Sequence, residues 1–201
     1  MKLFYAPGAC SLSPNIVAQE AGIELRLQKV DTKTKTMANA GDYWAINPKG
    51  YVPALELDNG EILTEGPTIV QYLADLKPAA GLAPAVGTLE RFRVQEMLGY
   101  INSEIHKTYS MLFKPALPAD VRAEREEYLL RRYELLDRKL EGRQYLFGDR
   151  FTIADAYLFT VMRWAQAVKV DLSRFANLQK FQERVGARPA VQAALRAEEL
   201  S

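Results

Sequence analysis

The sequence predicts a small α/β domain followed by an all-helical domain. Strand and helix signals alternate along roughly the first 80 residues. Segments with the two-residue apolar spacing of a strand are followed by segments with the three- to four-residue spacing of a helix. A stretch rich in Pro, Gly and Ala, KPAAGLAPAVG, follows at residues 77–87 and indicates a linker. Beyond it the apolar residues recur with helical period only. We therefore expect domains at residues 1–78 and 87–201, joined by a linker at residues 79–86.

The first domain contains one strand, one helix and a second strand before its midpoint. Residues 2–6 (KLFYA) form a short apolar strand candidate. Residues 14–22 (PNIVAQEAG) predict a helix, because Pro stands near the start and Gly at the end. Residues 24–30 (ELRLQKV) alternate between polar and apolar, as a half-buried strand does.

The domain closes with a hairpin and a helix. Residues 54–64 (ALELDNGEILT) predict the hairpin, since Asn59 and Gly60 tolerate the positive φ of a tight turn. Residues 67–76 (PTIVQYLADL) predict a helix with an apolar side. The expected order is β-α-β-(α)-β-β-α.

The second domain is expected to hold three long helices and two shorter ones. The long helices fall at residues 91–112, 119–141 and 151–168, and the third is nearly all apolar and therefore central. Its start carries Thr152 and Asp155 at the spacing of a capping box. The expected apolar stripe of the second helix is Tyr128, Leu129, Leu135, Leu136 and Leu140. Pro189 opens the last short helix.

Composition excludes several classes of function. Of the 201 residues, 48% are hydrophobic and 25% charged, and the net charge is +1, so no basic excess points to nucleic acid. No apolar run is long enough for a membrane span or a signal peptide, and we expect a cytoplasmic protein. One Cys and one His are too few for a structural metal site, so no metal is expected.

Cys10, the only cysteine, lies just before the first predicted helix in the segment FYAPGACSLSPN. Ser11 and Ser13 are both plausible N-caps of that helix. Unpaired amides and the helix dipole favour an anion there, so the position predicts a lowered thiol pKa. The alternative, a buried and inert thiol, stays open.

Five segments together resemble the bacterial beta class of cytosolic glutathione transferases. They are GACSLSP, NPKGYVPALEL, LTEGPTIVQYL, SEIHK and FTIADAYLF, in family order and spacing along the whole chain. The resemblance implies a thioredoxin-like N-terminal domain and an all-α C-terminal domain. It also implies that glutathione is the co-substrate and that the protein is a homodimer.

The resemblance implies a glutathione site in the first domain. Cys10 would lie beside the glutathione thiol, and Val52, held by a cis Pro53, would pair its backbone with the peptide. Glu65 and the backbone of Gly66 would bind the γ-glutamyl group, although much of the family has Ser in place of Gly66. A basic residue at Lys35 would meet the glycyl carboxylate.

The resemblance places further residues in the helical domain. His106, the only histidine, would face the thiol and act with Cys10 in catalysis. Ser103 and Glu104 would contact glutathione bound to the other subunit, and Gly99 stands where the family usually has Asn. The hydrophobic electrophile would bind at Tyr109, Phe113 and Trp164, each of which could equally be a core residue.

The resemblance thus predicts a detoxification enzyme that conjugates glutathione to electrophilic small molecules. Cys10 would add thiol–disulfide or dehalogenation chemistry through a glutathione mixed disulfide. A non-catalytic glutathione-binding or regulatory protein on the same scaffold is the alternative, because fold does not fix function. A monothiol redox protein acting on protein disulfides is a third hypothesis.

Overall fold

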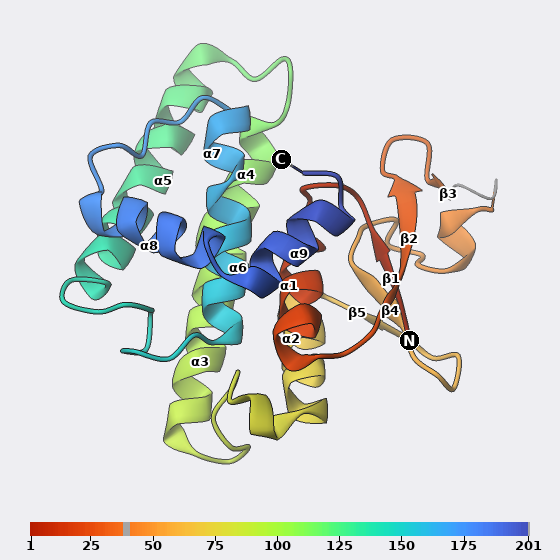
Figure 1. Ribbon diagram of the computed structural model, residues 1–201. Helices are drawn as coiled ribbons and strands as arrows, with labels where there is room; N and C mark the ends of the chain where they lie inside the picture. The colour runs from red at the N-terminus through yellow and green to blue at the C-terminus, as the bar shows by residue number, and fades with distance from the viewer. Residues whose placement is uncertain (38–40, 201) are drawn as a thin grey trace. The chain divides into compact units, whose positions relative to one another are not determined.

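The computed structural model describes residues 1–37 and 41–200 and divides into two compact units (Figure 1). The first joins Met1–Ala83 to the chain from Arg188 onward, and the second is Pro84–Ala187. The sequence-based division assigns residues 188–200 to the helical domain instead. In the structure the last helix, α9 (Pro189–Ala197), packs against α1 (Leu12–Ala21) and so belongs to the first unit. Ser201, also in that predicted domain, lies outside the described residues.

The first unit is built on a mixed sheet with strand order β3-β2-β1-β4-β5. The strands are β1 (Lys2–Tyr5), β2 (Arg26–Asp31), β3 (Thr36–Met37), β4 (Ala54–Glu56) and β5 (Ile62–Thr64). β1 runs parallel to β2 and antiparallel to β4, with Phe4 opposite Ala54. The predicted hairpin is confirmed, because β4 and β5 pair antiparallel with Leu55 opposite Leu63.

One predicted helix of the first unit is replaced by shorter elements. Between β2 and β4 the chain forms the short strand β3, which pairs with β2, and a single 3₁₀ turn, Tyr43–Ala45. Asp42 caps this turn by accepting a hydrogen bond from the Trp44 N–H at 2.9 Å. The bracketed helix of the expected order is therefore only one turn long.

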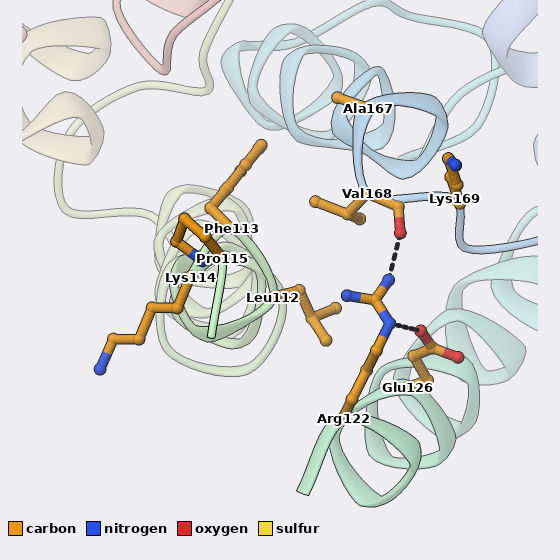
Figure 2. A pocket seen from close by; sticks show the side chains of 9 residues that line it. All are labelled: Leu112, Phe113, Lys114, Pro115, Arg122, Glu126, Ala167, Val168 and Lys169. Atoms are coloured by element: carbon orange, nitrogen blue, oxygen red, sulfur yellow. Dashed lines mark hydrogen bonds and ion pairs between the residues drawn. The ribbon is translucent and has the colours of Figure 1, made fainter. Parts of the chain in front are cut away.

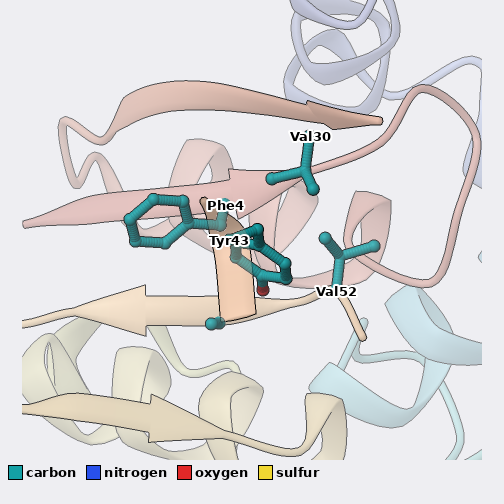
Figure 3. Close-up of a cluster of buried hydrophobic side chains, with 5 residues drawn as sticks. Phe4, Val30, Tyr43 and Val52 are labelled. Atoms are coloured by element: carbon teal, nitrogen blue, oxygen red, sulfur yellow. The ribbon is translucent and has the colours of Figure 1, made fainter. Parts of the chain in front are cut away.

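Both faces of the sheet are covered. On one face, Phe4, Val30 and Ala54 come from three neighbouring strands and pack with Tyr43 and Val52 (Figure 3). On the other, α1 packs against α2 (Gly66–Leu76), whose Ile69, Val70 and Leu73 are fully buried. A one-residue slip of β1 or β4 would exchange the side chains that pack on the two faces, so the different packing on each face specifies the register.

The second unit is helical in its described elements. They are α3 (Leu89–Tyr100), a π-helix (Ile101–His106), α4 (Lys107–Leu112), α5 (Ala119–Lys139), α6 (Ile153–Met162), α7 (Trp164–Ala167) and α8 (Ala176–Gly186). All ten residues of α6 are buried, which confirms its central position. The predicted helix at residues 151–168 is divided at Arg163 into α6 and α7.

The buried stripe of α5 differs from the expected one at three positions, and at the first of them Tyr128 is only partly buried. Leu135 is 48% exposed, whereas Tyr133 is fully buried and completes the stripe with Leu129, Leu136 and Leu140. The buried residues recur after four, three and four positions, which is the helical period. A tyrosine occupies the core position because its hydroxyl is satisfied there by the Tyr109 hydroxyl at 2.9 Å.

The capping box at the start of α6 is confirmed. The Asp155 carboxylate accepts hydrogen bonds from the Thr152 N–H at 2.8 Å and the Thr152 hydroxyl at 2.7 Å, and also from the Leu146 N–H at 2.8 Å. Asp155 is fully buried, and burial raises the pKa of its carboxyl to about 6 against the opposing effect of these hydrogen bonds. Asp155 therefore ties the loop before α6 to the helix start.

A membrane-spanning segment is not among the described elements. Each helix in residues 1–37 and 41–200 is too short or too polar to cross a bilayer.

Candidate functional site

Cys10 lies in a tight loop between β1 and α1. The loop is closed by the Ala9 N–H donating to the Ala6 carbonyl at 3.0 Å, and Gly8 takes a positive φ of 70° that L-residues rarely adopt. Cys10 as a residue is half-buried, and its thiol donates a hydrogen bond to the Val52 carbonyl oxygen at 3.2 Å. The loop thus places the sulfur beside the segment that leads into β4.

The two serines next to Cys10 do not act as side-chain caps, contrary to the sequence-based expectation. Ser11 stands at the N-cap of α1 but makes no capping bond. Its hydroxyl instead bridges the N–H and carbonyl of Ala6, each at 3.2 Å, and the Ser13 hydroxyl donates to the Cys10 carbonyl at 2.9 Å. Both side chains therefore brace the cysteine loop, not the helix.

The predicted lowering of the Cys10 pKa is wrong. Burial raises the pKa of the thiol to about 12, which outweighs the lowering by the backbone N–H groups of Cys10 and Ser11. The carboxylates of Glu65 and Glu198 raise it further. The helix start does favour a thiolate, but the cost of taking the charge out of water is larger.

The cis peptide bond that the family resemblance implies between Val52 and Pro53 is confirmed. Val52 is buried to 8% exposure and precedes β4, with its carbonyl directed at the Cys10 thiol. Before it, the Tyr51 carbonyl accepts from the Tyr43 hydroxyl at 2.8 Å and the Asn47 amide at 2.7 Å. These bonds hold the backbone that leads to Val52.

Glu65 and Gly66 stand at the start of α2. Glu65 is the N-cap with a positive φ of 68°, and its carboxylate pairs with the Lys49 ammonium at 2.6 Å. Gly66 is the buried first residue of the helix. A Cβ added to Gly66 would meet only the Pro53 ring, at an ordinary 3.7 Å. The backbone here presents an N–H at a helix start, which suits an anion.

Lys35 is fixed in place by its backbone and by two aromatic rings. It takes a positive φ of 59°, and its ammonium donates to the Gly50 carbonyl at 2.7 Å. The ammonium also lies 5.8 Å from the Trp44 ring centre and 5.6 Å from that of Tyr51. Lys35 is therefore a positioned cation on the first unit.

His106, in the second unit, ends the π-helix and takes part in a hydrogen-bond chain. Its Nδ1 lies 2.6 Å from the Tyr157 hydroxyl, which donates to the Asn102 side-chain oxygen at 2.8 Å. Because the hydroxyl hydrogen is used on Asn102, the Tyr157 oxygen accepts from Nδ1–H, and this bond orients the ring. The ring also packs edge-on against Trp164 at 4.8 Å.

Ser103 and Glu104 differ in exposure although they are adjacent. Ser103 is exposed, whereas Glu104 is half-buried and accepts from the Tyr128 hydroxyl and from the Arg132 Nε, the latter at 2.7 Å. These two hydrogen bonds hold the pKa of the Glu104 carboxyl below its usual range. Glu104 is therefore a carboxylate already paired within its own unit.

The predicted electrophile residues form one aromatic cluster, but they differ in accessibility. Trp164 packs edge-on against Tyr109 at 5.7 Å and Phe113 at 5.9 Å. Tyr109 is fully buried and Trp164 is 9% exposed, whereas Phe113 is 48% exposed. Of the three, only Phe113 exposes a large part of its side chain, and Trp164 packs against both Phe113 and Tyr109.

The structure brings the sequence-predicted residues together in two groups. Cys10 contacts Val52 in the first unit, which also holds Pro53, Glu65, Gly66 and Lys35. The second unit holds the residues numbered 103, 104, 106, 109, 113 and 164. Within the described residues, no three His, Cys, Asp or Glu side chains gather as metal ligands would.

Sequence reasoning missed the partners that orient these groups. Tyr157 and Asn102 orient His106, but Tyr157 stands in an apolar run that signals core packing only. Glu198, fully buried, accepts from the Gly8 N–H and the Asn15 amide, each at 3.1 Å. Because Glu198 lies 190 residues from Gly8 along the chain, no local sequence pattern connects the two residues.

Comparison with known proteins identifies the family of this chain. Family models match both parts of the chain: glutathione S-transferase, N-terminal domain, at residues 8–76, and glutathione S-transferase, C-terminal domain, at residues 100–189. Glutathione S-transferase GstA of Escherichia coli O157:H7 is 46% identical over 200 residues and covers 100% of both chains.

Solved structures agree with this assignment. BphK, described as a bacterial GST in a ternary complex, is 50% identical with a TM-score of 0.98 over 100% of both chains. Two others are each 42% identical over 100% of both chains: a sphingomonad glutathione S-transferase complexed with glutathione (TM-score 0.95) and a bacterial beta class glutathione S-transferase from Sphingomonas chungbukensis (TM-score 0.96). The chain therefore belongs to the glutathione S-transferase family and has its fold, with bacterial beta class enzymes among its near relatives.

Proposed function

We propose that the protein binds glutathione in its first unit and conjugates it to hydrophobic electrophiles. The observation that carries the proposal is the Cys10 loop closed onto the Val52 carbonyl, within a chain that belongs to this family along its full length. A relative that is 42% identical was solved in complex with glutathione. Detoxification in the cytoplasm is the corresponding role.

Glutathione would bind as a short extra strand at Val52, with backbone hydrogen bonds supplying orientation. The Gly66 N–H at the start of α2 would receive the γ-glutamyl carboxylate, and Glu65 would receive its ammonium group. The Glu65 carboxylate pairs with Lys49, and the Glu65 side chain is 59% exposed. When glutathione binds, this ion pair must open, or the carboxylate must accept from Lys49 and from the glutathione ammonium together. Lys35 would meet the glycyl carboxylate as a charge-assisted hydrogen-bond donor.

Cys10 would be activated by glutathione itself. A peptide N–H of glutathione donated to the Val52 carbonyl competes with the Cys10 thiol for the same oxygen. Released thiol then loses a proton more readily, because the hydrogen bond that stabilises its protonated form is gone. The thiolate attacks a disulfide sulfur of oxidised glutathione, forms Cys10–S–S–glutathione and expels one glutathione thiolate.

Dehalogenation would use the same mixed disulfide. Glutathione first displaces halide from the electrophile's carbon. The Cys10 thiolate then attacks the sulfur of the adduct, and the carbon leaves as a carbanion that takes a proton. A second glutathione reduces the mixed disulfide to free Cys10 and oxidised glutathione.

His106 would serve the reaction from the second unit. Its Nδ1 is bonded to Tyr157, which orients the ring, and the imidazole would accept a proton or orient the glutathione thiol. The electrophile would bind beside Phe113, with Tyr109 and Trp164 behind it. Ser103 and Glu104 would contact glutathione bound to a second copy, and the exposed apolar side chains Leu89 and Phe92 on α3 are consistent with a homodimer contact.

The test compares the wild type with Cys10→Ala. We expect the wild type to bind glutathione and to conjugate it to 1-chloro-2,4-dinitrobenzene. Intact-protein mass spectrometry with oxidised glutathione should show one adduct, which Cys10→Ala cannot form because no other thiol exists. Conjugation should survive in part in the variant. Glutathione binding without turnover of any electrophile would instead favour the non-catalytic alternative.

A further inference from the structure

His106 lies in a segment whose backbone departs from the α-helix. Between α3 and α4 the chain forms the π-helix Ile101–His106, and the Lys107 N–H donates to the Asn102 carbonyl, five residues earlier in the chain, where an α-helix uses the fourth. Such segments are rare and are frequently found at functional sites. The π-helix therefore needs a reason, and its side chains supply one.

One hydroxyl, that of Tyr157 on α6, bridges two side chains of the π-helix. It lies 2.6 Å from the His106 Nδ1 and donates to the Asn102 side-chain oxygen at 2.8 Å. Both partners therefore share the face of the π-helix against which α6 packs. Tyr157 is 1% exposed, and the Asp155 capping box fixes the start of α6 two residues before it. The bridging hydroxyl thus projects from a rigid helix.

The order of donors and acceptors in this bridge fixes the hydrogen on the imidazole. The Asn102 side-chain oxygen can only accept, so it takes the Tyr157 hydrogen, and the Tyr157 oxygen then accepts from the Nδ1–H of His106. A neutral histidine side chain free in water carries its hydrogen mostly on the other ring nitrogen. The bridge therefore selects a tautomer of His106 as well as a direction of its ring.

The ring that the bridge holds is in contact with the aromatic cluster of the proposed electrophile site. His106 lies edge-on to Trp164 at 4.8 Å, and Trp164 lies edge-on to Phe113 at 5.9 Å. Phe113 lines a pocket of about 420 Å³ together with Leu112 and Arg122, where α4, α5 and α7 meet (Figure 2). A rotation of the imidazole would therefore disturb ring contacts that extend to the wall of this pocket.

We propose that Tyr157 is a positioning residue for the transferase reaction: its hydroxyl holds Asn102 and His106 on one face of the π-helix and so fixes the direction and the hydrogen of the imidazole. The inference rests on the proposed function, in which His106 accepts a proton or orients the glutathione thiol. Tyr157 is buried and acts through His106. A group held in the productive geometry reacts faster than one that must first be ordered.

Nitrogen NMR of the isotope-labelled full chain, without a histidine tag and without glutathione, tests the bridge directly. His106 is the only histidine, so its ring nitrogens give unambiguous signals. At a pH where the ring is neutral, we expect the hydrogen on Nδ1 in the wild type. It should shift to Nε2 in Tyr157→Phe, which lacks the acceptor, and in Asn102→Ala, where the Tyr157 hydroxyl is released to donate to Nδ1.

Thr160→Val is the matched control for these spectra. It removes another fully buried hydroxyl from α6, one that donates to the Ala156 carbonyl and takes no part in the bridge. Its His106 signals should equal those of the wild type. Circular dichroism confirms that each variant is folded.

Steady-state kinetics with glutathione and 1-chloro-2,4-dinitrobenzene tests the consequence for the reaction. Tyr157→Phe should lower kcat about tenfold, because the imidazole is no longer held in line during the chemical step. The KM for glutathione should stay near the wild-type value, because the residues proposed to bind its γ-glutamyl and glycyl groups lie in the first unit. Thr160→Val should keep both values.

Three results would overturn the proposal: a wild-type His106 spectrum in Tyr157→Phe or in Asn102→Ala, the same spectral shift in Thr160→Val, or an unchanged kcat in Tyr157→Phe. A wild type that shows the expected spectra but no turnover would support the bridge and contradict the proposed function instead. Because the spectra are recorded without glutathione, the two failures are distinguishable.

Discussion

Gly66 is the residue at which the first unit departs most clearly from the pattern of its family. It opens α2 with an N–H available for an anion, but it has no hydroxyl to add a second donor. The position is not restricted to glycine by its surroundings. An added Cβ would lie 3.7 Å from the Pro53 ring, and Gly66 is not among the residues with positive φ. The site can therefore accept a side chain.

Gly66→Ser is expected to strengthen glutathione binding about tenfold, because a hydroxyl donor to a carboxylate contributes roughly 1.5 kcal/mol. Calorimetry with glutathione measures the affinity. Gly66→Ala is the matched control, since it adds the Cβ without the hydroxyl and should leave the affinity near that of the wild type. Equal gains in both variants would assign the effect to helix propensity, and no gain in either would mean that the γ-glutamyl carboxylate binds elsewhere.

Cys10 shows which properties of a residue cannot be predicted from its neighbours in the sequence. The position of Cys10 before a helix was visible in the sequence, and the favourable helix start is present. Its pKa nevertheless rises to about 12, because burial depends on the neighbours that tertiary structure supplies. The partner of the thiol, the Val52 carbonyl, is 42 residues away and a backbone atom. Neither the burial of the thiol nor its Val52 partner can be inferred from the residues next to Cys10 in the sequence.

Among the elements, those with local signals were predicted and those set by tertiary contacts were not. The hairpin around Asn59–Gly60 and the Thr152–Asp155 capping box are short-range devices, and both are confirmed. The region 91–112 was predicted as one helix, but a π-helix at Ile101–His106 interrupts it. A π-helix shifts the angular position of the residues that follow. Residues three apart in this segment, such as Ser103 and His106, therefore do not stand one above the other as they would in an α-helix.

Asp155 makes the free energy of unfolding depend on pH, and the direction follows from its raised pKa. Its folded pKa of about 6 lies above the ordinary value of 3.8, so the folded state binds the proton more strongly than the unfolded state does. Its contribution to stability is thus full below about pH 4 and is lost as the pH rises through about 6. On lowering the pH from 7 to 4, the wild type should gain on the order of 2–3 kcal/mol relative to Asp155→Asn.

Denaturant unfolding at several pH values measures this difference. At pH 7, Asp155→Asn should still be destabilised by about 1–3 kcal/mol, because its amide cannot accept from both Leu146 and Thr152. Lys2→Gln, which removes a partly exposed ion pair with Glu56, is a control expected to change stability little. A difference between the wild type and Asp155→Asn that stays constant between pH 4 and 7 would contradict the raised pKa.

At the scale of the whole molecule, the two ends of the chain complete one unit. Arg188 pairs with Glu20 through two hydrogen bonds of 2.6 and 2.8 Å, which fix the start of α9 on α1. Glu198 fixes its other end, where the carboxylate bonds to Gly8 and Asn15. The sequence-based boundary placed this segment with the helical domain, because an amphipathic helix does not indicate which surface it covers.

Glu198→Ala should lower the free energy of unfolding by about 3 kcal/mol, since it removes a buried acceptor from a backbone N–H and a side-chain amide. Glu199→Ala supplies the control: Glu199 is 83% exposed and pairs with Lys29 at only 3.7 Å, so its loss should cost less than about 0.5 kcal/mol. Thermal and denaturant unfolding measure both. Equal stability of the two variants would show that Glu198 does not hold the cysteine loop.

The bond between Gly8 and Glu198 also has a consequence for biosynthesis. The ribosome makes the cysteine loop 190 residues before the carboxylate that secures it. During translation the sheet and its first helices can form, but the face of α1 that receives α9 stays open until Val191, Ala194 and Leu195 have been made. The cysteine loop is therefore completed only after Glu198 has been made, and a chain terminated before that residue would carry Cys10 on an unfinished surface.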